Sequence, residues 1–214
     1  MQLVKDKPVL FIGAHTDDIE LFAGGLSSRL KREGVPQHWI TFSSHREVTD
    51  YKQAREEHCQ NAAYMAGKGN FDVLDYGACN GEFQQNRKYI YDIILRWVRK
   101  LKPQFVVTHP WDTNQDHQQI ISEALRSLKG EVSLLSGEYP FNDLGTSGLP
   151  NLYFKLEEED VKNKIALILN YKSQYAPHRH YFKPDVWRGL QTLRGAQIGA
   201  DFAEAYFVNR LTVV

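Results

Sequence analysis

The sequence predicts a single three-layer α/β domain, in which a mostly parallel sheet lies between two layers of helices. Segments with the pattern of strands alternate along the chain with segments whose apolar residues recur at helical spacing. The first strand segment, residues 8–14, is a continuous apolar run (PVLFIGA), which is typical of a parallel strand covered on both faces. The 214 residues contain no repeat and no linker, so we expect one domain over residues 1–214.

The expected elements follow one another with turn signals between them. Helices end near Gly34, near Gly67 and before Pro103, where glycine and proline are typical stop signals. The expected strands comprise residues 8–14, 38–43, 72–76, 104–110, 131–137, 151–156 and 203–213. The expected helices comprise residues 18–33, about 50–66, about 87–101, about 116–129 and 157–171. Because right-handed crossovers place the strand-to-helix loops at the carboxyl edge of such a Rossmann-like sheet, we expect a ligand site at that edge.

Composition and charge exclude several classes of protein. The 26 basic residues balance the 26 acidic ones, so no general field attracts nucleic acid or an anionic membrane surface. The apolar runs are far shorter than the ~20 residues of a membrane-spanning helix, and the N-terminus lacks the apolar region of a signal peptide. Cys59 and Cys79 fit neither a disulfide framework nor a metal motif. These features favour a cytoplasmic protein with reduced thiols.

The loop after the first strand carries residues that can bind a metal ion. His15 and Asp18 supply an imidazole nitrogen and a carboxylate oxygen, both of which are zinc ligands. The alternative is that acidic residues here only cap the following helix. A histidine followed by x-Asp-Asp at the end of a strand favours a metal site over a helix cap. Gly24-Gly25 lacks the GxGxxG pattern of a nucleotide-binding module, so we expect it to permit close packing of helix on sheet.

A second polar cluster, residues 109–117 (HPWDTNQDH), follows the strand at 104–110 and lies at the same predicted edge. His117 could complete a His/Asp/His set with His15 and Asp18. Three protein ligands and an open position for water are typical of catalytic zinc, and Fe²⁺, Mn²⁺ or Co²⁺ would also suit this set. The set lacks the additional carboxylates of a two-metal hydrolase. The alternative is a solvated loop in which Asp116 caps the next helix.

The two clusters resemble the motifs of the PIG-L/LmbE-like family of zinc-dependent N-deacetylases. Residues 14–18 (AHTDD) with Gly24-Gly25 match the family motif A-H-P-D-D…GG except at Thr16. Residues 112–117 (DTNQDH) match the second motif, P/D-x-H-x-D-H, at its terminal Asp-His. Residues 203–206 (AEAY) are similar to the family's late A-E-A-aromatic segment. The resemblance therefore runs from the opening strand to the end of the chain.

The resemblance implies a metal-dependent hydrolase that removes an N-acetyl group from an N-acetylglucosamine-type sugar or conjugate. It assigns Zn²⁺ to the set of His15, Asp18 and His117, and it makes Asp17 the general base that activates a metal-bound water. The family holds its substrate with an arginine after the second strand, for which Arg55 and Arg46 are the candidates. Trp111 could stack on a sugar ring, with core packing as the alternative. Family relatives are often trimers or hexamers, which makes a homo-oligomer the expectation.

The chain departs from the family at Asn114, where the second motif commonly has a histidine that the aspartate, here Asp116, orients. Asparagine can donate a hydrogen bond to an oxyanion but cannot deliver a proton at neutral pH. Two alternatives follow. Asp17 serves as base and then as acid while Asn114 polarises the intermediate, or the chain is a weakened or inert relative that binds a sugar or partner. Residues 175–181 (YAPHRHY) could form a lid or an ordinary surface loop.

Overall fold

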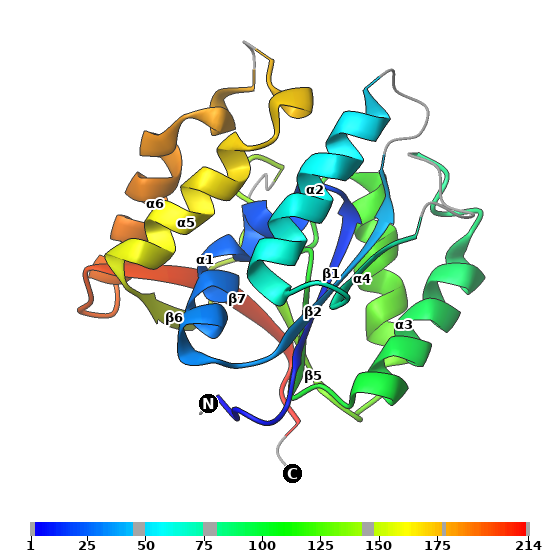
Figure 1. Ribbon diagram of the computed structural model, residues 1–214. Helices are drawn as coiled ribbons and strands as arrows, with labels where there is room; N and C mark the ends of the chain where they lie inside the picture. The colour runs from blue at the N-terminus through cyan, green and yellow to red at the C-terminus, as the bar shows by residue number, and fades with distance from the viewer. Residues whose placement is uncertain (1–2, 45–49, 75–80, 143–147, 177–178, 213–214) are drawn as a thin grey trace.

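The computed structural model describes residues 3–44, 50–74, 81–142, 148–176 and 179–212 (Figure 1). Seven strands of these ranges form one sheet in the order β3-β2-β1-β4-β5-β7-β6. The strands are β1 (Val9–His15), β2 (Gln37–Ser43), β3 (Phe71–Val73), β4 (Phe105–Thr108), β5 (Ser133–Gly137), β6 (Leu152–Leu156) and β7 (Phe202–Arg210). Strands β1 to β5 pair in parallel, whereas β7 is antiparallel to both β5 and β6.

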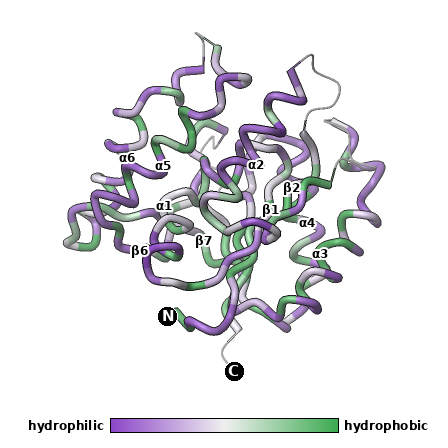
Figure 2. Tube along the Cα trace, viewed as in Figure 1, coloured by the Kyte–Doolittle hydropathy of each residue, from purple (hydrophilic) through white to green (hydrophobic). Residues whose placement is uncertain are grey.

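Helices cover both faces of this sheet (Figure 1). They are α1 (Asp18–Glu33), α2 (Tyr51–Ala66), α3 (Arg87–Leu101), α4 (Gln115–Ser127), α5 (Glu158–Leu169) and α6 (Pro184–Ala196), with 3-10 turns η1 (Lys172–Gln174) and η2 (His180–Phe182). One apolar core joins the sheet to α1, α2, α5 and α6, and a second core joins the opposite face to α3 and α4. Hydrophobic residues accordingly concentrate along the central strands, while the outer helices carry hydrophilic stretches (Figure 2).

The fold class is confirmed, with differences at particular elements. The expected strand at 104–110 ends at Thr108, and residues 75–76 of the expected third strand lie outside the described ranges. Helix α6 lies where the sequence analysis expected no helix, because its buried face carries Gln191 and Gly195 beside Trp187 and so lacks an apolar pattern. It begins with Pro184, whose fixed φ suits a first helical position. None of the helices in the described ranges is long and apolar enough to cross a membrane.

Glycines allow α1 to approach the sheet closely. A Cβ atom at Gly25 would lie 2.6 Å from Leu156 Cδ1 on β6. A Cβ atom at Gly137, on β5, would overlap the backbone carbonyl oxygen of Phe22 in α1. The close helix–sheet packing expected at Gly24-Gly25 is therefore confirmed, and it places the start of α1 directly over the carboxyl ends of the central strands.

Substitution of Gly137 tests this packing. Gly137→Ala should lower the free energy of unfolding by roughly 1–3 kcal/mol, because the added methyl group meets backbone that cannot rotate away. Gly189→Ala is the matched control, since its Cβ would meet no atom within 4 Å. In the interior of α6 that change should stabilise by about 0.5–1 kcal/mol. Urea denaturation measures both, and a neutral Gly137→Ala would contradict the close approach.

Candidate metal centre

The carboxyl ends of β1 and β4 lie side by side, because these two strands are parallel neighbours. β1 ends on His15, α1 begins shortly afterwards at Asp18, and His117 lies in the first turn of α4. One ligand atom from each of these residues lies within 4.8 Å of the others, and all three side chains are buried. The structure thus brings together the three residues that the sequence analysis assigned to a metal.

Each imidazole of the set is held by a second carboxylate. His117 Nδ1 lies 2.7 Å from Asp112 Oδ2, and His15 Nε2 lies 3.1 Å from Asp116 Oδ2. The opposite nitrogens face Asp18, with His15 Nδ1 at 3.3 Å and His117 Nε2 at 3.4 Å from its oxygens. His117 Nε2 is buried and has no hydrogen-bond partner among the described residues. When the outer carboxylates take the N–H of each ring, the inner lone pairs and Asp18 form a donor set that fits a metal ion.

The helix caps decide between two interpretations of the acidic residues. Asp17 occupies the N-cap position of α1, but its side chain makes no capping hydrogen bond. The cap of α4 is Asn114, whose side chain accepts hydrogen bonds from the N–H groups of Asp116 and His117. The alternatives in which Asp17 or Asp116 serves as a side-chain cap are therefore wrong. Asp116 instead lies 3.1 Å from His15 Nε2, so the predicted orienting aspartate faces a histidine of the first loop rather than one of its own motif.

Burial and mutual attraction shift the pKa values of the set. Burial disfavours the charged imidazoles, but the neighbouring carboxylates together outweigh it: Asp18 with Asp116 raises the pKa of His15 to about 10, and Asp18 with Asp112 raises that of His117 to about 9. Burial also opposes ionisation of Asp18, yet the surrounding imidazoles hold its pKa well below the ordinary value. For Asp17, burial and then the charge of Asp18 raise the pKa to about 6. A carboxyl group with a pKa near neutrality can accept a proton and return it.

A further imidazole, His109, lies against the set, although the motif reading gave it no role. The Ala14 N–H donates to His109 Nε2 over 2.9 Å, and burial followed by the charge of His117 lowers the pKa of His109 to about 4. His109, Asp112 and His117 also lie close enough to hold a metal ion. However, the His109 and His117 rings stack at 3.8 Å with planes 19° apart, so their in-plane lone pairs do not converge. We therefore place the candidate centre at His15, Asp18 and His117.

Two groups missed by the motif reading border the centre. The Tyr139 ring lies 5.3 Å from that of His117, measured between centroids. Arg179 is close enough to Asp17 for its positive charge to oppose the effects of burial and of Asp18 on the pKa of Asp17. The described part of segment 175–181 therefore contributes a cation beside the predicted base. In the sequence, only the basic and aromatic composition of that segment indicated that it could contribute to the site.

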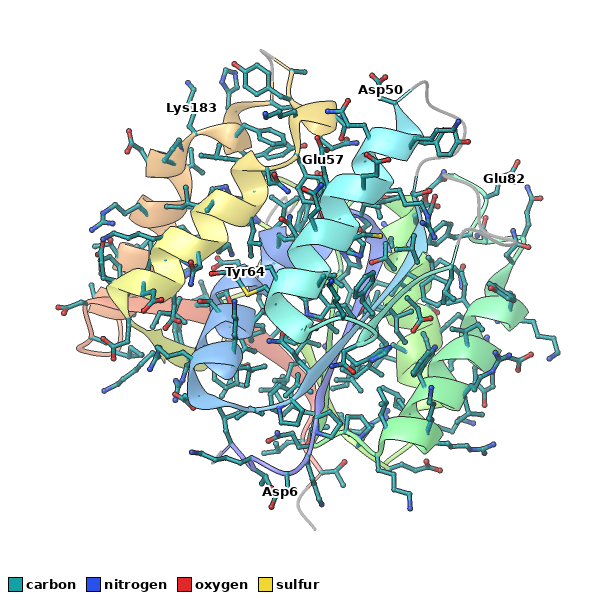
Figure 3. All side chains as sticks on the ribbon, viewed as in Figure 1. Asp6, Asp50, Glu57, Tyr64, Glu82 and Lys183 are labelled. Carbon is teal, nitrogen blue, oxygen red and sulfur yellow. The ribbon has the colours of Figure 1, made fainter. Side chains whose placement is uncertain are left out.

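Behind the β1–α1 loop, a buried network fixes the Thr16 carbonyl. His58 Nδ1 donates to the Thr16 oxygen over 2.6 Å, and the Tyr171 hydroxyl donates to the same atom. Glu57 on α2, labelled in Figure 3, accepts a 2.5 Å hydrogen bond from the Ser173 hydroxyl and so ties α2 to the segment after α5. No sequence spacing indicated these contacts, because they join the β1–α1 loop, α2 and the segment after α5.

The predicted substrate-binding residues have different outcomes. Arg55 is exposed on α2, the helix after the second strand, and Arg46 lies outside the described residues. Trp111 is 44% exposed, so the core-packing alternative is wrong. It lines a cavity of about 280 Å³ together with Asp116. Substrate binding by Arg55 and by Trp111 stays a prediction.

Comparison with known proteins shows what the chain is similar to. Residues 10–128 match the family described as PIG-L, GlcNAc-PI de-N-acetylase. The chain is 28% identical over 173 residues to the uncharacterized deacetylase YaiS of Escherichia coli K12, covering 79% of this chain and 92% of that protein. N,N'-diacetylchitobiose deacetylase from Pyrococcus horikoshii has a TM-score of 0.72 at 18% identity, covering 94% of this chain and 83% of the other. GalB, the 4-carboxy-2-hydroxymuconate hydratase from Pseudomonas putida KT2440, has a TM-score of 0.72 at 19% identity, covering 97% and 98%. These two structural likenesses show the fold.

Asp112 should control metal affinity by holding His117. Asp112→Asn should weaken binding of Zn²⁺ by about 10–100-fold, because the ring loses the charged partner that fixes its orientation. Asp72→Asn is the matched control, since Asp72 holds His38 at 3.0 Å on β2, away from the centre. Competition with a chromophoric chelator gives both affinities. Equal affinities in the two variants would show that His117 does not depend on Asp112.

Proposed function

The chain belongs to the PIG-L family, and from this membership we propose that it is a metal-dependent hydrolase that deacetylates an N-acetylglucosamine-type sugar or conjugate. The observation that carries the proposal is the buried set of His15, Asp18 and His117 with Asp17 beside it. The likeness to a hydratase shows that the fold alone does not select the reaction. The side chains at the carboxyl edge must therefore select it.

His15 Nδ1, His117 Nε2 and a carboxylate oxygen of Asp18 would hold the metal. Two imidazole nitrogens and one carboxylate suit Zn²⁺, and also Fe²⁺, Mn²⁺ or Co²⁺. When bound, such an ion lowers the pKa of water and polarises the amide carbonyl. The outer carboxylates Asp112 and Asp116 keep both rings in the required tautomer, because a carboxylate can only accept from the ring N–H.

Asp17 moves the proton in the proposed reaction. Its carboxylate accepts a proton from the attacking water, and a C–O bond forms to the acetamide carbon. The protonated Asp17 then donates to the leaving nitrogen as the C–N bond breaks, which gives acetate and a free amine. A pKa raised to about 6 suits both steps near neutral pH. Arg179 stabilises the ionised form and so keeps Asp17 available as a base.

Asn114 supports the oxyanion in this proposal. Its Oδ1 accepts the Asp116 N–H over 2.9 Å and the His117 N–H over 3.4 Å, which fixes the plane of the amide. The Nδ2 group is then the donor that we assign to the developing oxyanion. Helix capping and oxyanion binding use opposite ends of the same side chain, so the two roles are compatible.

Asp17→Asn and His117→Ala should fail in different ways. Asp17→Asn should retain about one metal ion per chain and lose roughly 10²–10⁴-fold in amine release, because only the proton acceptor is removed. His117→Ala should lose the metal as well as turnover. Elemental analysis and a fluorogenic amine assay on N-acetylglucosamine and N,N'-diacetylchitobiose measure the two quantities. Full turnover in Asp17→Asn would refute its role. Metal without amine release in the wild type would favour an inert relative that binds a sugar.

Asn114 variants separate the cap from the oxyanion donor. Asn114→Asp keeps an acceptor for the helix N–H groups but loses the amide donor, so we expect normal stability and a loss of ~10²–10³ in turnover. Asn114→Ala loses both functions and should also destabilise by about 0.5–2 kcal/mol. Thermal denaturation beside the amine assay distinguishes them. If Asn114→Asp turns over at the wild-type rate, Asn114 is only a helix cap.

A further inference from the structure

Helix α1 is broken at Ala23, whose φ of −145° and ψ of 15° are not helical. The break separates a short first segment, Asp18–Phe22, from the longer remainder of the helix. In an unbroken helix the Gly25 N–H would donate to the Leu21 carbonyl, four residues earlier. In this structure each of those two backbone groups bonds to a charged side chain from another element.

The two side chains are Lys164 of α5 and Glu204 of β7, which form a buried ion pair. Lys164 Nζ donates to the Leu21 carbonyl over 2.7 Å and to Glu204 Oε1 over 2.6 Å. Glu204 Oε1 accepts the Gly25 N–H over 3.1 Å, and its Oε2 accepts the Leu26 N–H over 2.6 Å. The ion pair therefore bridges the two backbone groups that this helical hydrogen bond would join, with the ammonium at the carbonyl and the carboxylate at the amide.

Both charges are satisfied although their side chains are only 2% and 4% exposed. The Tyr206 hydroxyl donates to Glu204 Oε2 over 2.6 Å, so each carboxylate oxygen accepts two hydrogen bonds. Lys164 Nζ also lies 4.5 Å from the centre of the Trp187 ring. A buried ion pair stays stable only when further hydrogen bonds complete both partners, as they do here.

The helix ends at the break favour this arrangement of charge. The first segment presents its carbonyl end, which carries partial negative charge, and the remainder presents its amide end, which carries partial positive charge. Lys164 faces the carbonyl end of the first segment, and Glu204 faces the amide end of the remainder. Gly24 and Gly25 provide the space, since a Cβ atom would lie 2.9 Å from Lys164 Cγ or 3.1 Å from Glu204 Oε1.

We propose that Lys164 and Glu204 are positioning residues for the metal centre. By holding the Leu21 carbonyl away from the Gly25 N–H, the pair fixes the first segment of α1 independently of the remainder. That segment begins with Asp18, so the pair sets the approach of Asp18 to the two imidazoles. This inference rests on the proposed function. Without the pair, the helical hydrogen bond between Gly25 and Leu21 can form, α1 becomes continuous, and Asp18 moves.

The test compares metal binding in Lys164→Met/Glu204→Gln with that in Arg32→Met. The double variant removes both charges and leaves no unpaired buried charge. Arg32→Met is the matched control, because Arg32 pairs with Asp160 at 2.9 Å and also joins α1 to α5, but beyond the break. The probe is Co²⁺, whose visible absorption reports ligand geometry, titrated against a chelator. Circular dichroism and thermal midpoints establish that each protein is folded.

The double variant should bind Co²⁺ at least about 10-fold more weakly with an altered visible spectrum, since misplaced outer groups typically cost 10–100-fold. Arg32→Met should match the wild type in Co²⁺ affinity and in visible spectrum. Wild-type affinity and spectrum in the folded double variant would overturn the proposal. If it does not fold, the isosteric Glu204→Gln is measured in its place. If neither Lys164→Met/Glu204→Gln nor Glu204→Gln folds while Arg32→Met does, the ion pair is required for folding and the positioning role is rejected. A wild type that binds no Co²⁺ would refute the metal centre itself, and the inference with it.

Discussion

The buried carboxylate of Asp18 is the constraint on which the site depends. Its Oδ2 accepts the backbone N–H of His15 over 2.6 Å and lies 3.3 Å from His15 Nδ1, while its Oδ1 lies 3.4 Å from His117 Nε2. A carboxylate removed from water is costly unless cationic or hydrogen-bonding groups surround it. The parallel neighbours β1 and β4 supply those groups from two separate loops. Because β1 and β4 are neighbours at the centre of the sheet, the candidate metal ligands of the two loops lie close together.

Much of this arrangement could be predicted from the sequence, because it follows from periodicity and strand direction. The alternating apolar segments predict a parallel sheet, and a parallel sheet aligns the residues that follow its strands along one edge. His15, Asp18 and His117 could be grouped on that basis, although 99 residues separate Asp18 from His117. The family motifs added the role of Asp17, which spacing alone did not assign. The oligomeric state that the resemblance implies stays a prediction.

The remainder depends on contacts that leave no periodic signal. Asp112 could be read as part of the second motif, but only the folded loop shows that its carboxylate faces His117 Nδ1. Helix α6 was missed because Gln191 and Gly195 occupy positions on its buried face. Lys164 and Glu204 lie on α5 and β7, and neither residue has a spacing that points to the other. Sequence patterns group the candidate ligands well because these lie at the end of β1 or in the first helical turns that follow β1 and β4. Sequence patterns do not locate the side chains that orient those ligands, because such side chains can belong to any element of the fold.

The loss of the family histidine at Asn114 concentrates the proposed chemistry on one carboxyl group. His109 is the nearest replacement, but it is buried, its Nε2 accepts the Ala14 N–H, and its pKa is lowered to about 4 by burial and by His117. An imidazole that is neutral near pH 7 has no readily released proton to deliver to a leaving amine. In the proposed reaction Asp17 must then act first as base and afterwards as acid, and a pKa raised to about 6 suits both steps near neutral pH. In the proposed mechanism, the burial that raises the pKa of Asp17 therefore contributes to catalysis. A more solvated Asp17 would remain ionised and could not return the proton that the reaction needs.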